Sequence, residues 1–149
     1  MKAQDAVQRK ERTQEVIDAS NTVRAAISQL CDRRVSALIV TDNGRLVGVV
    51  EPEDVFSRLV EIGGAALDEE IAELIVEEPV TVCPDVLLSD VEKVFQERRV
   101  NHVVVVSGET VEGILTPADV LTRLLDHVEF LNEHLRNYVS TVGYSPPPE

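Results

Sequence analysis

The chain has 149 residues, of which 44% are hydrophobic but only 3% aromatic, so aliphatic side chains must fill its core. Its 27 acidic residues outnumber its 14 lysines and arginines and give a formal net charge of -13, which repels a phosphate backbone and argues against nucleic-acid binding. No segment approaches the roughly 18 consecutive apolar residues of a membrane span. Because the polar N-terminus also has no hydrophobic secretory region, we predict a cytoplasmic protein without membrane insertion.

The first predicted unit covers residues 16–62 and follows an N-terminal helical or flexible segment at residues 1–15. Apolar residues at helical spacing between Thr22 and Leu30 predict its first helix. Asn43-Gly44 favours a hairpin between two strands, and Pro52 suits the first turn of a second helix. The predicted order is therefore a short polar strand, a helix, two strands and a helix, at residues 15–17, 22–30, 37–40, 46–50 and from 52 onward.

A predicted linker at residues 63–79 begins where Gly63-Gly64 interrupts the helical pattern. Its apolar residues predict a short amphipathic helix, and they are Leu67, Ile71, Leu74 and Ile75. The second unit covers residues 80–126 and repeats the order of the first. Its strands and helices are expected at residues 80–82, 88–95, 103–106, 111–115 and from 117 onward.

A C-terminal extension at residues 127–149 continues the last helix beyond what one domain needs. Its apolar stripe runs through Leu121, Leu124, Leu125, Val128, Leu131 and Leu135. The stripe has two interpretations, because it can pack on the chain's own core or against a second subunit. The proline-rich tail from Tyr144 onward is predicted to be disordered.

The two units are copies of one another. A shift of 65 residues superimposes residues 33–60 on 98–125 without a gap. The identical positions include Arg33-Arg34-Val35 with Arg98-Arg99-Val100, Gly48 with Gly113, Pro52 with Pro117, and Asp54-Val55 with Asp119-Val120. Most of the remaining pairs exchange one aliphatic side chain for another. The chain therefore arose by duplication.

Each copy resembles a CBS domain, whose pattern is Gly-aliphatic-aliphatic-Thr/Ser-x-x-Asp followed by a helix. The second copy matches this pattern from Gly113 through Thr116 to Asp119. The first copy runs from Gly48 to Asp54 but has Glu51 in place of the hydroxyl residue. The resemblance covers about residues 16–125. It implies an α+β fold of two tandem CBS domains, a Bateman module, packed about a pseudo-twofold axis.

The resemblance also implies two clefts and a regulatory function. In many CBS pairs the clefts bind AMP, ADP, ATP or S-adenosylmethionine, and the pairs often dimerise. We therefore expect an adenine nucleotide, most readily AMP or ATP, as a regulatory ligand and no required cofactor. Binding would signal to an effector protein through a change of conformation or oligomeric state. The alternative is a ligand-independent dimerisation module.

Carried onto this sequence, the family's ligand site in the second copy comprises Thr81, Val82, Pro84, Asn101, His102, Val103, Thr116 and Asp119. A weaker site in the first copy comprises Val16, Ile17, Ser36, Ala37 and Asp54. We expect the first site to be weaker because Glu51 places negative charge near any bound phosphate. A lone histidine just before a buried strand, such as His102, is more often a packed or exposed side chain than a ligand contact.

Thr116 and Asp119 have two interpretations that can hold together. The Asp119 carboxylate can accept hydrogen bonds from both ribose hydroxyls, with Thr116 nearby. Equally, the two residues can form a capping box at the start of the last helix. Arg34, Arg58, Arg99 and Arg123 can neutralise phosphates. Arg58 and Arg123 follow the two motif aspartates by four residues, however, which favours exposed ion pairs on one helix face.

Catalysis is not expected. The sequence contains no nucleophile elbow and no phosphate-binding loop. His102, His127 and His134 lie in different local contexts without a spaced cysteine or carboxylate. Cys31 and Cys83 lack the spacing of a zinc site or a disulfide framework, and two unpaired thiols fit a reducing cytoplasm. We therefore expect neither an enzyme nor a metal site.

Overall fold

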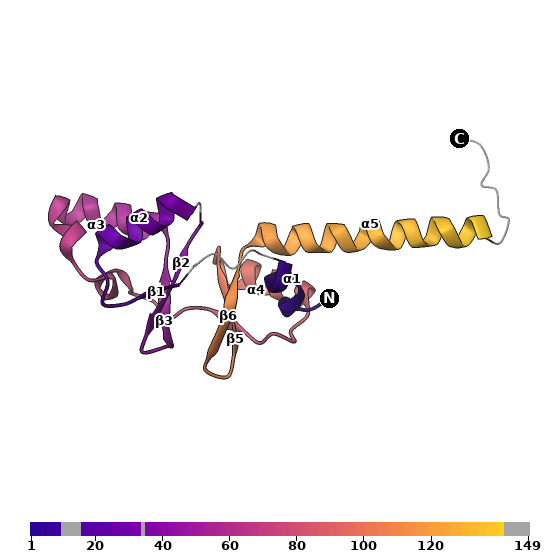
Figure 1. Ribbon diagram of the computed structural model, residues 1–149, viewed down its shortest axis with the longest axis horizontal. Helices are drawn as coiled ribbons and strands as arrows, with labels where there is room; N and C mark the ends of the chain where they lie inside the picture. The colour runs from indigo at the N-terminus through magenta and orange to yellow at the C-terminus, as the bar shows by residue number, and fades with distance from the viewer. Residues whose placement is uncertain (10–15, 34, 142–149) are drawn as a thin grey trace.

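The computed structural model describes residues 1–9, 16–33 and 35–141, so the tail predicted to be disordered lies outside the described residues. Two α+β units lie side by side, each a small sheet with helices on one face, and a long last helix extends away from them (Figure 1). The first unit contains β1 (Val16–Asp18), α2 (Val23–Arg33), β2 (Leu38–Asp42), β3 (Arg45–Val50) and α3 (Pro52–Ile62). The second contains β4 (Thr81–Val82), α4 (Leu88–Arg98), β5 (Val103–Ser107), β6 (Thr110–Leu115) and α5 (Pro117–Thr141). The α+β architecture predicted from the repeat is confirmed.

The two sheets have the same topology. In each, the short first strand is parallel to the middle strand, which is antiparallel to the third. Both hairpins have an irregularity at the same place, after Val40 in β2 and after Val105 in β5. The first hairpin turns at Asn43 and Gly44, whose φ angles of 52° and 81° are those of the tight turn that Asn-Gly favours.

The middle strands are buried on both faces because the sheets face one another. Leu38 and Val40 pack against helices α2 and α3 in the core of the first unit. Ile39, which alternates with them, points to the opposite face and packs with Val104 and Ile114 of the second unit. This shared cluster of aliphatic side chains joins the two repeats, and it explains why β2 and β5 read as continuous apolar runs.

The N-terminal helix α1 (Ala3–Arg9) belongs to the second unit, although it precedes the first in sequence. Ala3, Ala6 and Val7 are buried in the core built around α4, β5 and β6. The amide of Ala3 donates to the carbonyl of Val86 at 2.8 Å, and the amide of Leu88 donates to the carbonyl of Met1 at 2.9 Å. The start of the chain thus completes the core of the second unit.

The linker departs from the single amphipathic helix that its apolar residues predict. It forms two short 3-10 segments, η1 (Gly63–Asp68) and η2 (Ile71–Leu74). Helix α3 ends at Gly63, which has a φ of 71°, and the chain is extended at Glu69 and Glu70 between the segments. The predicted apolar positions are nevertheless used, since Ile71 and Leu74 are buried in the first core.

Candidate functional site

A cleft of about 340 Å³ lies between the two repeats. One side is the end of β3 and the start of α3, and the other is the chain that enters β4 and the chain that enters β5. We call this the inter-repeat cleft; its lining residues are Val49, Glu51, Asp54, Leu74, Ile75, Val76, Glu77, Glu78, Pro79, Val80, Arg98, Val100 and His102. It contains the Glu-x-x-Asp form of the first CBS-like motif.

Glu51 and His102 bridge the repeats inside this cleft. Nδ1 of His102 lies 2.8 Å from Oε1 of Glu51, and its Nε2 lies 3.2 Å from Oγ of Ser36. The His102 side chain is only 9% exposed, so both ring nitrogens find partners in a largely desolvated position. The interaction joins the end of one sheet to the start of the middle strand of the other, and it holds Glu51 on the cleft wall.

This bridge has no counterpart in the other half of the pseudo-symmetric module. At the 65-residue offset, Glu51 corresponds to Thr116 and His102 corresponds to Ala37. The departure of Glu51 from the family's hydroxyl residue is therefore matched by a histidine that pairs with it across the repeats. One half of the module carries a polar pair where the other half has a threonine and an alanine.

Asp54 caps helix α3 from inside the cleft. Its Oδ2 accepts a hydrogen bond from the amide of Glu51 at 2.8 Å. Burial raises the pKa of the Asp54 carboxyl, the bond from the Glu51 amide opposes that shift, and the nearby negative charges of Glu51, Glu53 and Glu77 add to it. The cleft is thus an electronegative environment in which a further anion costs free energy.

Thr116 and Asp119 form the capping box at the start of α5. The Thr116 amide donates to Oδ2 of Asp119 at 2.8 Å, and the Asp119 amide donates to Oγ1 of Thr116 at 3.2 Å. Residues 75–80, which line the inter-repeat cleft, correspond at the 65-residue offset to residues 10–15. Those residues lie outside the described part of the chain.

The remaining candidates from the second copy are distributed over several environments. Thr81 is exposed, Val82 is partly buried against the second core, and Val103 is fully buried there. The carbonyl of Pro84 accepts a hydrogen bond from the amide of Gln4 at 2.9 Å. Asn101 lines a different groove, on the outer face of the unit. Of this predicted set, only His102 lines the inter-repeat cleft.

The candidates from the first copy are similarly spread. Val16 is 46% exposed, whereas Ile17 is buried in the first core and Ala37 lies in the cluster between the sheets. Ser36 contacts His102, and Asp54 lines the cleft. The prediction grouped the residues within each copy, whereas the inter-repeat cleft draws on both. The sequence-based prediction did not include Arg98 or the chain that leads into β4, both of which line the cleft. The duplication could have indicated them, because two facing copies place residues of both in one cleft.

The predicted ion pair between Arg58 and the motif aspartate is wrong. The Arg58 guanidinium instead donates to both carboxylate oxygens of Glu69, each at 2.8 Å, and also to Glu61 at 3.2 Å. This paired geometry lowers the pKa of the Glu69 carboxyl, while burial opposes that shift. Arg58 therefore fastens α3 to the linker. In the second copy, Nε of Arg123 is buried without a hydrogen-bond partner among the described residues.

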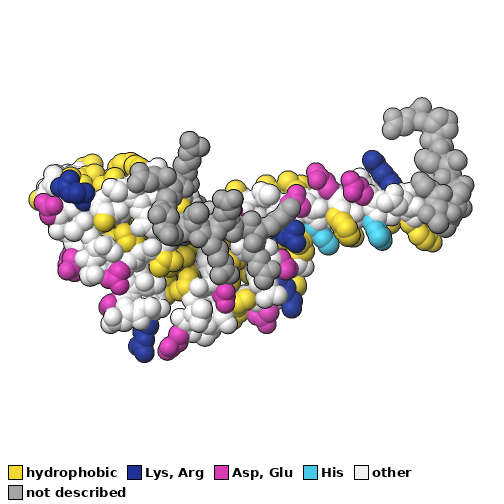
Figure 2. Space-filling view, in the orientation of Figure 1, with side chains coloured by type: hydrophobic (Ala, Val, Ile, Leu, Met, Phe, Trp, Pro, Cys, Tyr) yellow, Lys and Arg dark blue, Asp and Glu magenta, His cyan; other side chains and the backbone are white. Residues whose placement is uncertain are grey.

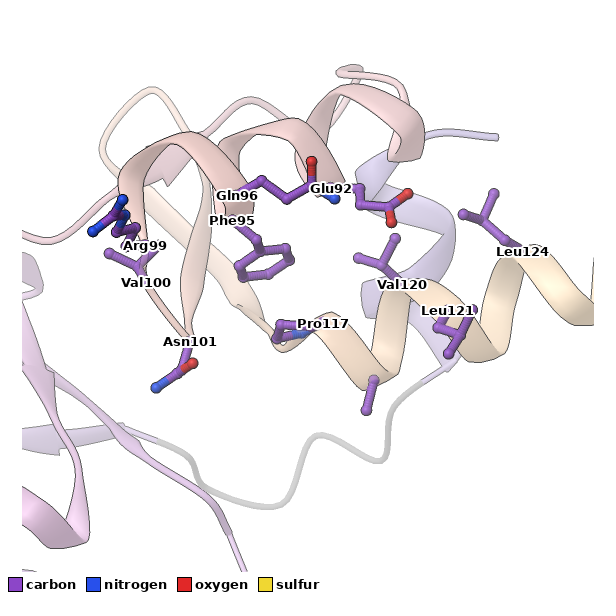
Figure 3. A pocket seen from close by; sticks show the side chains of 11 residues that line it. Glu92, Phe95, Gln96, Arg99, Val100, Asn101, Pro117, Val120, Leu121 and Leu124 are labelled. Carbon is purple, nitrogen blue, oxygen red and sulfur yellow. The ribbon is translucent and has the colours of Figure 1, made fainter.

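Two apolar grooves lie on the helical faces, away from the inter-repeat cleft. The larger one, the α4–α5 groove, has a volume of about 550 Å³ (Figure 3). Phe95 of α4 and Pro117, Val120, Leu121 and Leu124 of α5 line it. A groove of about 330 Å³ occupies the corresponding place between α2 and α3, and its lining includes Val55 and Leu59. Both grooves are apolar, unlike the cleft.

Comparison with known proteins identifies the architecture. The CBS domain family model matches residues 12–61 and 71–126. The chain belongs to the CBS-domain family. Those two segments make it a tandem pair, as the repeated motif predicted. In the described residues, no helix is long and apolar enough to cross a membrane, and no group of three or more His, Cys, Asp or Glu side chains could hold a metal ion.

Solved CBS structures share this fold. A CBS-domain protein of Agrobacterium tumefaciens is 20% identical with a TM-score of 0.72, and the match covers 81% of this chain and 91% of that one. The AcuB protein of Vibrio cholerae is 20% identical with a TM-score of 0.76, over 89% and 96% of the two chains. CBSX2, solved in complex with AMP, is 25% identical with a TM-score of 0.68, over 84% and 96%.

A curated relative extends beyond this module. It is an uncharacterized 33.4 kDa protein of Thermofilum pendens, 33% identical over 101 residues. The match covers 67% of this chain and 33% of the relative, so the chain spans about a third of that protein's length.

Proposed function

We propose that this chain is a regulatory module, not an enzyme, which binds an adenosine-containing ligand between its repeats. The observation that carries the proposal is the tandem CBS pair, whose second motif keeps the family's Thr116 and Asp119. The AMP complex of CBSX2, a relative of the same fold, supports an adenine nucleotide as the ligand. AMP and ATP are the ligands we favour, ahead of ADP and S-adenosylmethionine, and no cofactor is required.

We place the stronger site at Thr116 and Asp119. The inter-repeat cleft at the other motif is lined by four carboxylates, those of Glu51, Asp54, Glu77 and Glu78, against the guanidinium of Arg98. Coulomb repulsion from these groups raises the cost of bringing a phosphate into it. Thr116 replaces Glu51 at the second motif and removes one of those charges. The N-terminus of the long helix α5 there adds a favourable dipole for an anion.

The site's helix cap is compatible with ligand binding. Oδ2 of Asp119 accepts the bond from the Thr116 amide, and a carboxylate has lone pairs for further donors such as ribose hydroxyls. Thr81, Val82, Pro84, Asn101, His102 and Val103 complete the proposed second-motif set, and Val16, Ile17, Ser36, Ala37 and Asp54 the weaker one. The module would act in the cytoplasm as a homodimer, through its uncovered helical grooves, and pass the signal to a separate effector protein.

Calorimetric titration of nucleotide-free protein with AMP, ADP, ATP and S-adenosylmethionine tests the proposal. We expect saturable binding of about one ligand per chain. Asp119→Asn keeps an oxygen for the helix cap but loses the charge that favours the ribose hydroxyls, so it should weaken binding at least tenfold. Asp54→Asn is the matched control at the other motif and should leave the main site intact. Two equal sites would contradict the predicted asymmetry.

A ligand-independent interaction module is the second candidate, and one observation favours it. The bridge from His102 to Glu51 and Ser36 connects the repeats across the cleft through protein side chains alone. If no nucleotide gives heat while the protein remains a stable dimer, this second function replaces the first.

A further inference from the structure

Among the described residues, no other element covers an apolar stripe on the second half of helix α5. Val128, Leu131, Leu135 and Tyr138 are 46–65% exposed, on a helix that projects beyond both repeats (Figure 1). The stripe packs on the chain's own core only at its start, where Leu124 lies against the second core, and not from Val128 onward. Tertiary packing supplies most helical stability, and within the described chain this part of α5 lacks it. The stripe therefore requires a covering surface.

The spacing of the stripe identifies the kind of surface. Its side chains follow one another at alternating intervals of three and four residues, which is the a and d pattern of a coiled coil. They are Leu121, Leu124, Val128, Leu131, Leu135 and Tyr138. The seam is about 27 Å long at 1.5 Å per residue. Such a repeat is self-complementary, since each a and d side chain fits between those of an identical helix.

The charges of the same helix favour a second copy of this chain as the occupant. Asp126, Glu129 and Glu133 occupy the b and f positions, which face away from the seam. The flanking e and g positions carry Leu125, His127, Asn132 and His134, and none of these is a carboxylate, lysine or arginine. Acidic side chains lie along one side of the projecting helix, opposite hydrophobic and histidine side chains (Figure 2). A chain of net charge -13 thus avoids placing carboxylates against its own copy.

The stripe is also continuous with the α4–α5 groove. Leu121 and Leu124 line the groove and begin the heptad pattern (Figure 3). In a parallel pair, the grooves of both copies meet at one end of the coil. In an antiparallel pair the two bodies lie at opposite ends, and each groove meets only the end of the partner's helix. Since fewer than three heptads make a weak coil, the body contact is needed to support it.

We propose that residues 121–138 form a parallel two-stranded coiled coil with the same helix of a second copy. The proposal deepens the homodimer of the proposed function and requires no nucleotide. It places the joining surface on a helix that extends beyond both CBS repeats. Two modules would then be held with their α4–α5 faces together.

Disulfide trapping in the full chain tests the seam. Cys31 and Cys83 are first replaced by serine, and a single cysteine is then introduced as Leu131→Cys at the seam or as Glu133→Cys on the opposite face. Under mild oxidation, the seam variant should form the covalent dimer at least tenfold faster. Equal rates would overturn the proposal, as would cross-linking only at Glu133→Cys.

Sedimentation equilibrium separates this proposal from the homodimer itself. Leu131→Glu puts a carboxylate in the seam, and Thr122→Glu puts one at an outer b position of the same helix. We expect only Leu131→Glu to raise the dimer dissociation constant, by tenfold or more. A dimer unaffected by Leu131→Glu and without preferential seam cross-linking would overturn the coiled coil but keep the homodimer. A monomeric wild-type chain would overturn both.

Discussion

Gly48 in β3 lets the linker approach the sheet, and its replacement by alanine should be destabilising. A Cβ at this position would lie 2.8 Å from Cγ2, 3.1 Å from Cδ1 and 3.2 Å from Cγ1 of Ile75. Carbon atoms reach their optimum separation at about 3.5–4.0 Å, so all three contacts would be too close. Because Ile75 also lines the inter-repeat cleft, the side chain that must move belongs to the candidate site.

The expected cost follows from this overlap. Inserting one carbon into a packed site costs about 1–3 kcal/mol. For a chain of this size, each kcal/mol lowers the melting temperature by about 2–4 °C. Gly48→Ala should therefore melt about 2–12 °C below the wild type. Thermal and urea unfolding, followed by circular dichroism, measure the change.

Two further variants make the result specific. A Cβ on Gly64 would meet nothing within 4 Å, so Gly64→Ala should leave stability unchanged or raise it slightly. Ile75→Ala removes all three crowding atoms, and Gly48→Ala should then cost at least about 0.5 kcal/mol less than in the wild type. The close approach of Ile75 would not explain the glycine at position 48 if Gly48→Ala is as harmless as Gly64→Ala. The same holds if Gly48→Ala loses equal stability in the wild type and in Ile75→Ala.

Three other predictions concern polar contacts. Glu51→Ala and His102→Ala should each lower the free energy of unfolding by about 1–3 kcal/mol, because each leaves a partly or largely buried partner without its hydrogen bond. In urea unfolding, the double variant should lose less than the sum of the two single losses. The Arg58–Glu69 pair lowers the Glu69 pKa, so its contribution to the free energy of unfolding is present above the ordinary glutamate range and is lost as the pH falls through the lowered value. Glu69→Gln should therefore flatten this part of the acid-unfolding curve. An unchanged curve would contradict the role given to the pair. Thr116→Ala removes a helix cap and should cost about 0.5–2 kcal/mol in the same assay, whereas no loss would mean that the cap is not used.

Local features of the fold could be predicted from the sequence because neighbouring residues determine them. The turn at Asn43-Gly44 requires positive φ angles that these residues tolerate. Helices α3 and α5 begin at Pro52 and Pro117, where a missing amide costs nothing. The duplication predicted the overall architecture, because two copies of the same sheet can bury their equivalent apolar faces against each other.

Long-range pairings could not be predicted in the same way. His102 meets Glu51 across 51 residues of sequence, and only the facing of the two sheets brings them together. Arg58 has Asp54 four residues away on its own helix, yet the linker returns Glu69 to a position that allows two hydrogen bonds. Spacing rules along one helix favour Asp54 as the partner, whereas the tertiary structure offers Glu69, which accepts two hydrogen bonds.

Mapping of backbone amides by NMR during titration with AMP tests the central claim most directly, because it locates binding in the intact chain. If the chain is a nucleotide-binding CBS pair with its stronger site at the second motif, the amides of Thr116 and Asp119 should shift most and saturably. Those of Glu51 and Asp54 should shift less. Amides of both motifs that stay unmoved at millimolar AMP, ATP and S-adenosylmethionine would contradict the account.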